Sequence, residues 1–319
     1  MVDLKPAVVI WDPTSIILPA STSRLQNAKQ QTETSSTRMV QLSSYLRTHI
    51  PELLVTTVLV AYSLARAKLT PVGVLAALLT ALIHTLAPTS LPFSLLVLFF
   101  LCGTIATRVN HATKATLTQS STGGAGGEGP RNAAQVLANS ASASLVILAS
   151  VFFRNSVTAR AVVVGTAANY AAAAADTLSS ELGILSRSAP FLITQPWRRV
   201  ARGTNGGVTV AGLAAGALGG AVIAIAAGLS ERDSRLAMGV LTAGVCGTVL
   251  DSVLGALVQV TVEDKNSGRI IEGANGRRVI VEKGGSRVQR GFDLLNNNGV
   301  NFAMTATITV VAMLVMGQR

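Results

Sequence analysis

Long runs without charged residues constrain this chain more than any other feature. No formally charged residue lies between Lys68 and Arg108, and further uncharged apolar runs occupy residues 132–153 and 203–230. A helix needs about 20 apolar residues to cross the hydrocarbon core of a bilayer. Only 13% of the 319 residues are charged, about half the share found in soluble domains. The chain is therefore predicted to be an all-α polytopic membrane protein.

We expect about eight transmembrane helices in a single domain at residues 51–319. The run after Lys68 is too long for one helix, and Pro88 and Pro92 divide it because proline breaks a helix interior. Residues 1–50 are rich in Ser, Thr, Gln and Asn, which is typical of a disordered tail. The expected helices are at residues 53–69, before and after 88–92, at 132–153, at 161–181, within 203–230, at 236–260 and at 294–318.

The basic residues are unevenly distributed over the connectors. Sixteen of the 26 Lys and Arg residues fall in connectors on one side of the predicted helices, and four fall in the connectors opposite. The positive-inside rule places the sixteen-charge side in the cytosol or its topological equivalent. The net charge of +11 is thereby explained by membrane orientation. No nucleic-acid partner is expected, because no recognition motif accompanies the charge.

Two connectors on the basic side are long. Residues 110–131 are rich in Gly, Ser and Thr, which is typical of a flexible loop. Residues 261–290 form an extramembrane loop in which two β-rich runs flank Asn275 and Gly276. Asn-Gly between apolar runs is the strongest short signal for a β-hairpin. We predict a small hairpin there, with a plain solvated loop as the alternative.

Acidic residues within the apolar segments are the main candidates for function. Asp176 and Glu181 end the alanine-rich helix, and Asp251 lies in the middle of an apolar run. Carboxylates at such positions are costly and usually mark a site where an ion or polar substrate is handled. A divalent cation would offset that cost, and Mg²⁺ binds one or two carboxylates together with substrate phosphates. Asp176 and Glu181 are predicted to hold it; interhelical hydrogen bonding is the structural alternative.

Basic and glycine-rich segments accompany these carboxylates on the predicted cytosolic side. Arg131, Arg199 and Arg202 would meet phosphate oxygens. Residues 203–207 (GTNGG) precede the sixth helix and would wrap an anion with backbone N–H groups. The combination suits phosphoryl transfer, in which positioning and charge neutralisation do most of the work.

Small residues predict close helix packing in the sixth segment. Gly212, Gly216 and Gly220 are spaced four residues apart and share one helix face. Such spacing lets two helix backbones approach each other closely in a membrane. We interpret these glycines as structural.

Five short blocks resemble signature segments of the transmembrane protein 19-like family, which includes a plant phytyl-phosphate kinase. The resemblance spans residues 55–316, and the blocks occur in the family's order. They are residues 131–139 (RNAAQVLAN), 175–183 (ADTLSSELG), 202–209 (RGTNGGVT), 250–259 (LDSVLGALVQ) and 295–302 (LNNNGVNF).

The resemblance implies a membrane lipid kinase that transfers a phosphoryl group from a nucleoside triphosphate, CTP by expectation, to an isoprenoid phosphate. It implies residence in an internal membrane such as the endoplasmic reticulum, with the plastid envelope as an alternative. It makes Asp251 a further catalytic candidate beside Asp176 and Glu181. The candidates that it implies for nucleotide or polar contacts, together with those named above, are Arg131, Asn132, Arg199, Arg202, Gly203, Asn205, Gly206, Gly207, Asn297 and Asn301.

Two other function classes stay open. A transporter would use the same carboxylates as an ion relay, and a scaffold would need no catalysis. Carboxylates gathered in one cytosol-facing cleft would favour the kinase, whereas a polar path across the bilayer would favour transport. Carboxylates on unrelated faces would favour the scaffold. The sequence leaves homo-oligomer formation open.

Overall fold

The computed structural model describes residue 44 and residues 47–121, 129–153, 157–273, 278–281 and 285–317. The chain divides into two compact units, Met1–Leu54 and Val55–Arg319. The predicted tail at residues 1–50 therefore lies almost entirely outside the described residues. Of the first unit, residue 44 and residues 47–54 are described, and they include the start of a helix in which His49 and Glu52 lie 3.8 Å apart. The second unit carries everything that follows.

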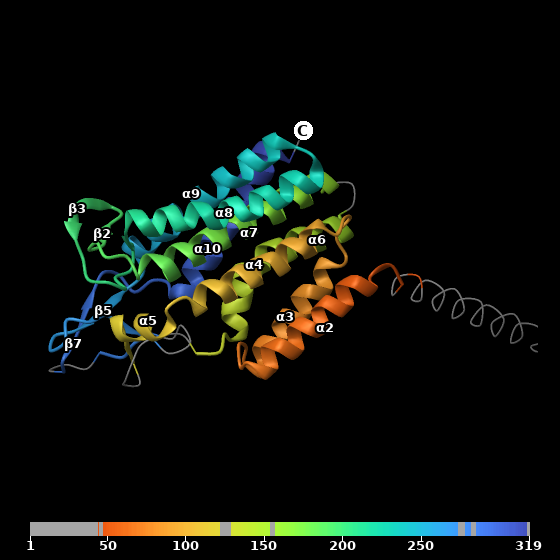
Figure 1. The fold of residues 1–319 in the computed structure, drawn as a ribbon. Coiled ribbons are helices and arrows are strands. Elements are labelled where there is room, and N and C mark those ends of the chain that lie inside the picture. The colour runs from red at the N-terminus through yellow and green to blue at the C-terminus, as the bar shows by residue number, and fades with distance from the viewer. Residues whose placement is uncertain are drawn as a thin grey trace, which may run out of the picture. The chain divides into compact units, whose positions relative to one another are not determined.

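All eight predicted apolar segments form helices, and a ninth, short helix lies in a connector of the described chain (Figure 1). The helices are α2 (Ile50–Ala65), α3 (Pro71–His84), α4 (Leu91–Arg108), α5 (His111–Leu117), α6 (Ala133–Phe152), α7 (Ala159–Gly183), α8 (Val210–Glu231), α9 (Ser234–Val258) and α10 (Asn297–Met316). The strands are β1 (Gln119–Ser120), β2 (Phe191–Leu192), β3 (Gln195–Arg199), β4 (Gly207–Val208), β5 (Thr261–Asp264), β6 (Ile271–Glu272) and β7 (Arg287–Arg290).

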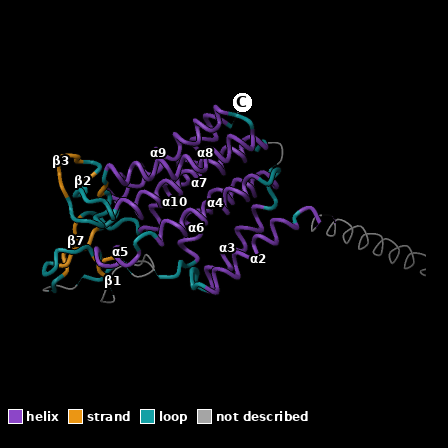
Figure 2. Tube along the Cα trace, viewed as in Figure 1, coloured by secondary structure: helices purple, strands orange, loops and turns teal. Residues whose placement is uncertain are grey.

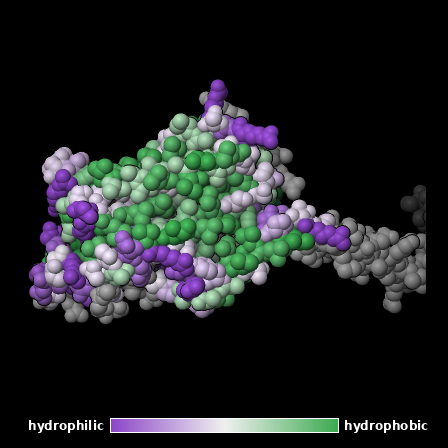
Figure 3. All heavy atoms as spheres, in the orientation of Figure 1, coloured by the Kyte–Doolittle hydropathy of each residue, from purple (hydrophilic) through white to green (hydrophobic). Residues whose placement is uncertain are grey.

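Five of the described helices are long and apolar enough to cross a membrane: α4, α6, α8, α9 and α10. The membrane class is therefore confirmed, but the count of eight spans is not. With 16 and 14 residues, α2 and α3 are shorter than a spanning helix. The 25-residue α7 is rich in alanine, and its buried position removes the need for lipid-facing apolar side chains. On the face shown in Figure 3, hydrophobic residues cover the helices of the second unit.

The central helix of the second unit is α7. It contacts α4, α6, α8, α9 and α10, and every residue from Val162 to Ala175 is buried. Glycines make this close packing feasible. A Cβ on Gly216 would lie 3.0 Å from the Ala175 carbonyl oxygen, and one on Gly220 would lie 3.3 Å from the Gly244 Cα atom of α9. The predicted glycine face at Gly212, Gly216 and Gly220 is thus confirmed.

Side-chain caps set where several helices begin. The Thr209 hydroxyl accepts a hydrogen bond from Gly212 N at the start of α8, and Asn296 Oδ1 accepts one from Gly299 N at the start of α10. Asn132 and Gln135 form a reciprocal capping box at the start of α6. Each cap satisfies an N–H group that would otherwise have no partner in the helix. These caps fix the helix ends at one end of the bundle, where the candidate site lies.

Strands from the connectors gather at that same end (Figure 2). Strand β2 lies between β3 and β4, β5 pairs antiparallel with β7, and β1 pairs parallel with β6. The loop predicted to be flexible at residues 110–131 thus contains α5 and β1. The expected Asn275–Gly276 turn lies outside the described residues. In the described part of the flanking runs, Ile271 and Glu272 pair with β1, and residues 278–281 are in no strand.

Candidate functional site

A polar cavity of about 690 Å³ occupies this end of the second unit. It lies where α4, α7 and α9 end and where α6, α8 and α10 begin, and the basic connectors surround it. Eleven of the sequence-predicted residues line it. They are Arg131, Asp176, Glu181, Arg202, Gly203, Asn205, Gly206, Gly207, Asp251, Asn297 and Asn301. Asn132 and Arg199 are not among the lining residues.

Asp176 and Asp251 come together in this cavity from different helices. Asp176 is the first residue of α7 beyond its fully buried stretch, and its carboxyl group contacts that of Asp251 on α9. Asp251 Oδ1 is buried and has no hydrogen-bond donor among the described residues. Two carboxylates in contact repel each other unless a proton or a cation lies between them. The pair is therefore built to hold positive charge.

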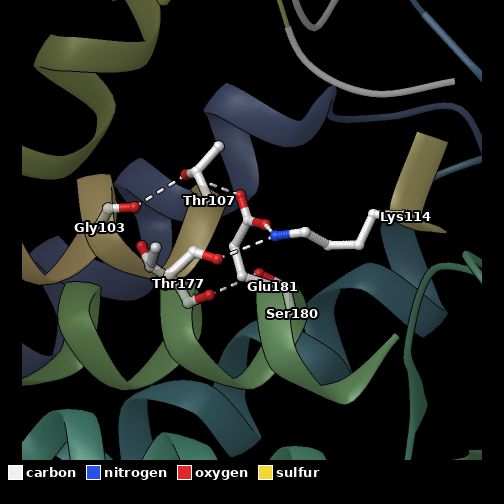
Figure 4. A network of polar contacts seen from close by, with 7 residues as sticks. Gly103, Thr107, Lys114, Thr177, Ser180 and Glu181 are labelled. Atoms are coloured by element: carbon white, nitrogen blue, oxygen red, sulfur yellow. Dashed lines mark hydrogen bonds and ion pairs between the residues drawn. The ribbon is translucent and has the colours of Figure 1, made fainter. Parts of the chain in front are cut away.

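Glu181 lies in a separate cluster at the cavity wall. Its Oε1 accepts a hydrogen bond from Thr107 of α4 at 3.1 Å, and its Oε2 forms an ion pair with Lys114 of α5. Lys114 also donates to the Ala106 carbonyl oxygen at 2.9 Å. Figure 4 shows Glu181 between the two donors. The carboxylate is thus already neutralised by the protein.

Asp176 and Glu181, which were predicted to hold a metal together, have different neighbours in the structure. Residues five apart on a helix point about 140° away from each other. Asp176 meets Asp251 of α9, whereas Glu181 turns toward Thr107 and Lys114. In the described part of the chain, no group of three or more His, Cys, Asp or Glu side chains is arranged to hold a metal by itself.

Arg131 reaches the cavity from the segment before α6. Its backbone pairs with Lys68 and Thr70 through hydrogen bonds of 3.0 Å each, which fixes its position. A Cβ on Gly103 would lie 3.4 Å from Arg131 Nη1, so the missing side chain leaves room for the guanidinium group. Within the described ranges, no ion pair or side-chain hydrogen bond joins this half-buried cation to another residue. Arg131 is therefore available to an anion.

The other predicted arginines have structural partners. Arg202 Nη1 donates to the Ile184 carbonyl oxygen at 2.8 Å and also to that of Ser186, so its guanidinium holds the turn after α7. Arg199 Nη1 donates to the Ala189 carbonyl oxygen at 3.0 Å and lies over the Phe191 ring. Arg199 is exposed on β3, outside the cavity. Of the predicted arginines, Arg131 is the best placed to meet a ligand.

The glycine-rich loop at residues 203–207 forms part of the cavity wall. Gly203 and Gly206 have φ angles of +84° and +75°, and a Cβ on Gly206 would lie 2.4 Å from Ala256 Cβ. Both positions therefore require glycine. The N–H groups of Thr204, Asn205 and Gly207 donate to Ala201 O, Thr261 Oγ1 and Thr204 O. The expected N–H cradle for an anion is thus largely used inside the protein.

The four predicted asparagines differ in their roles. Asn205 Nδ2 donates to the Val260 carbonyl oxygen at 2.7 Å and ties the glycine loop to the end of α9. Asn132 is the N-cap of α6 and does not line the cavity. Asn297 and Asn301 lie one turn apart at the start of α10 and do line it. The last two add polar groups to the cavity wall, and the N-cap of α10 is Asn296.

A family model for the integral membrane protein DUF92 matches residues 54–309. The chain belongs to the DUF92 family. Protein PGR of Arabidopsis thaliana is similar, with 35% identity over 254 residues, 69% of this chain and 80% of that protein. An uncharacterized membrane protein of Methanocaldococcus jannaschii is 33% identical over 165 residues, 52% of this chain and 64% of that protein. No solved structure matches. The comparisons agree with a multi-pass integral membrane protein.

Sequence reasoning missed several cavity residues of this DUF92 protein. Lys114 was not singled out, because α5 lies in a connector whose composition resembles a flexible loop. Arg278 lines the cavity and forms an ion pair with Asp293, with Nε and Oδ1 3.0 Å apart. Asn139 lines the cavity from α6, and its Oδ1 is buried without a hydrogen-bond donor in the described chain. Its spacing of seven residues from Asn132, which places both on one helix face, was the available sequence signal.

One turn beside the cavity is held by a carboxylate outside the helices. Asp264 ends β5, and its Oδ2 accepts hydrogen bonds from the Ser267 hydroxyl at 2.8 Å and from Ser267 N at 3.2 Å. The hydrogen bonds from the side chains of Ser267 and then Ser286 hold the pKa of Asp264 below its ordinary value. Its role is to fix the loop over the cavity.

Proposed function

We propose that this DUF92 protein is a membrane lipid kinase that transfers a phosphoryl group from a nucleoside triphosphate to an isoprenoid monophosphate. The observation that carries the proposal is the contact between Asp176 and Asp251 in a cavity that Arg131 also lines. Opposed carboxylates and a free cation are the groups needed to hold a metal-bound triphosphate and an anionic acceptor. The resemblance to the transmembrane protein 19-like family supports the same class of reaction.

The carboxylate pair fits Mg²⁺, which takes one or two carboxylates and completes its shell with water and phosphate oxygens. The buried, donor-free Oδ1 atom of Asp251 is the structural feature that such an ion would satisfy. When bound, Mg²⁺ would neutralise charge on the donor phosphates. We assign the metal contacts to Asp176 and Asp251 instead of Glu181, since Lys114 and Thr107 already occupy the Glu181 oxygens.

The remaining residues position the reactants. Arg131 binds the acceptor phosphate, while Asn297 and Asn301 supply polar contacts from α10. The acceptor oxygen attacks the γ-phosphorus of the donor in line, a P–O bond forms, and the bond to the nucleoside diphosphate breaks. The products are an isoprenoid diphosphate and a nucleoside diphosphate. A phosphate acceptor is already ionised, so the reaction needs no strong general base from the protein.

The shape of the site favours this function over transport. The polar cavity is confined to one end of the second unit, and the next three turns of α7, which are rich in alanine, are buried. The core polar groups nearby form hydrogen bonds with each other: Asn169 Nδ2 donates to the Asn139 carbonyl oxygen at 2.8 Å, and Tyr170 contacts His84. Among the described residues, the buried alanines of α7 therefore offer no polar groups along this helix for alternating access.

The direct test is phosphoryl transfer by the full-length protein in detergent or lipid nanodiscs. Terminally labelled CTP or ATP is incubated with Mg²⁺ and a panel of prenyl monophosphates, and labelled prenyl diphosphate is measured. Asp176→Asn and Asp251→Asn should lose the activity. Glu263→Gln, which removes a carboxylate that pairs with Arg290 outside the cavity lining, should keep it. Equal activity in all four proteins, or none in the wild type with any donor, would refute the proposal.

A further inference from the structure

A second, apolar cavity of about 260 Å³ lies within the second unit beside the polar one. It is formed by residues of α2, α3, α4 and α6, including Leu59, Ala77, Phe93, Val97 and Val136. We call it the apolar groove. Its volume is near the lower end of the range for small-molecule sites, about 300 Å³. It therefore suits one apolar chain better than the two chains of a common phospholipid.

Several polar side chains in the wall of the apolar groove have partners within the protein. Thr80 and Ser140 form a hydrogen bond with each other at 3.3 Å, and Ser63 donates to the Leu59 carbonyl oxygen at 2.7 Å. Thr107 donates to the Gly103 carbonyl oxygen at 2.8 Å. With these groups satisfied, the groove offers an occupant mainly apolar contacts.

The apolar groove and the polar cavity adjoin each other. They share five lining residues, all in the segment that leads into α6 or in its first two turns: Gly129, Pro130, Arg131, Gln135 and Asn139. One ligand can therefore have its apolar part in the groove and its polar part in the cavity.

Arg131 lies at this junction. Its half-buried guanidinium has no ion pair or side-chain hydrogen bond with any other residue that the structure describes. An unpaired cation next to an apolar surface is costly, and an anionic group on the ligand would remove that cost. Charge complementarity thus favours an amphiphile whose head carries negative charge where its chain begins.

We infer that the apolar groove binds the single hydrocarbon chain of a phosphate-bearing amphiphile, and that Arg131 selects the phosphate head at the mouth of the polar cavity. The inference rests on the proposed function for the reaction that follows, but binding itself needs neither nucleotide nor metal. Isoprenoid and straight alkyl chains share this chemistry, so both are tested.

The experiment uses photolabelling of the full-length protein in nanodiscs, without nucleotide. The probe is farnesyl monophosphate with a photoreactive group at the end of its chain, and labelled peptides are mapped by mass spectrometry. Labels should fall on α2, α3, α4 or α6 residues of the apolar groove. Unlabelled farnesyl monophosphate and dodecyl monophosphate should compete, whereas inorganic phosphate should not. Labels confined to other helices would overturn the inference.

Two variants sharpen the result. Ala77→Phe fills the groove and should lower probe affinity about tenfold or more. The matched control is Ala61→Phe, on the exposed side of α2 and outside both cavities, which should bind as the wild type does. Arg131→Gln should weaken farnesyl monophosphate about tenfold through loss of a charge-assisted contact, and leave farnesol competition unchanged. Equal affinity in Ala77→Phe and Ala61→Phe would reject the groove, and farnesol competing as well as the monophosphate would reject the role of Arg131.

These outcomes are separate from the kinase assay. Labelling of the apolar groove without any phosphoryl transfer would support the binding site and reject the proposed function. Phosphoryl transfer that Ala77→Phe and Arg131→Gln leave unchanged would support the kinase and reject the groove.

Discussion

Asp233 and Asp251, which lie toward opposite ends of α9, have contrasting surroundings. At the α8–α9 turn, Asp233 forms an ion pair with Arg160 at 2.9 Å and accepts hydrogen bonds from Arg235 N and Leu236 N. At the other end, Asp251 contacts a second carboxylate, Asp176, and has a buried oxygen without a donor in the described chain. Asp233 thus contributes to stability, whereas we propose that Asp176 and Asp251 bind a ligand.

This contrast shows that close packing around the middle of α7 can compensate for the energetic cost of two carboxylates in contact near the end of that helix. Alanines 171–175 are fully buried, and the glycine faces of α8 and α9 fit against them or against each other. A rigid core of this kind can hold two carboxylates in contact that would otherwise move apart. Functional sites often contain such destabilising groups, because activity and stability place different demands on the same residues.

The largest effect is expected from the Lys114–Glu181 ion pair. Lys114→Met leaves the Glu181 carboxylate without its cation at a site where the two side chains are only 9% and 17% exposed. Breaking a buried pair by removing one partner costs about 3–5 kcal/mol. Denaturant unfolding in detergent should record that loss. The double variant Lys114→Met/Glu181→Leu should recover most of the lost free energy of unfolding. A loss in the double variant equal to the sum of the losses in the two single variants would show that the residues do not interact.

The next prediction is that a substitution in the Asp176–Asp251 pair lowers activity without lowering stability. Asp251→Asn removes one of two charges that repel each other, so the free energy of unfolding should stay the same or rise. Phosphoryl transfer should fall about a hundredfold, as it does when one preorganised electrostatic group is lost. Thermal unfolding and the kinase assay are measured on the same preparation. A variant that is both inactive and markedly less stable would indicate a structural role.

Gly219→Val tests the close packing of α8 against α7. A Cβ at Gly219 would lie 2.5 Å from the Ala174 carbonyl oxygen, so the larger side chain must push α8 away from α7. Overpacking of this kind costs about 1–3 kcal/mol. Ala214→Val, which is on the exposed side of α8, is the control for adding a branched side chain. Equal unfolding temperatures of the two variants would contradict the close α7–α8 contact.

The smallest expected effect is the pH dependence of the stabilisation that the Asp233 carboxylate provides. Hydrogen bonds from Leu236 N, then from Arg160, lower the pKa of Asp233 from its ordinary value. A lowered folded-state pKa means that the stabilisation is complete above the ordinary value near 4 and is lost as pH falls through the folded value. Asp233→Asn keeps a helix cap but removes the charge. The wild-type advantage in unfolding temperature should be present at pH 6 and shrink below pH 4; a constant difference would reject the linkage.

Local patterns in the sequence predicted much of the fold. The eight apolar helices, the glycine face of α8 and the two acids at Asp176 and Asp251 were all visible, because burial in a membrane leaves a clear signal in composition. The count of eight spans is not confirmed, because five of the described helices are long and apolar enough to cross a membrane. Hydropathy does not reveal that α7 is surrounded by other helices or that α2 and α3 are short.

Contacts between segments that lie far apart in the sequence could not be predicted from local patterns. The parallel pairing of β1 with β6 joins Gln119 to Ile271, and such pairing depends on the whole fold. The Lys114–Glu181 pair likewise needs α5 to pack beside the end of α7. Asp176 and Glu181 were predicted to act together because both lie at the end of an apolar helix, but their side chains meet different neighbours, Asp251 and Lys114. The roles of Arg131, Asn297 and Asn301 stay predictions.

The central claim is that Asp176 and Asp251 together hold a divalent cation, and Mn²⁺ in place of Mg²⁺ tests it most directly. Electron paramagnetic resonance of the full-length protein, titrated with Mn²⁺ in the presence of a non-hydrolysable nucleoside triphosphate, measures the ion bound above that held by the nucleotide alone. We predict a protein-dependent Mn²⁺ site that disappears in Asp176→Asn/Asp251→Asn and persists in Glu263→Gln. Identical Mn²⁺ binding by the wild type and the double variant would contradict the account.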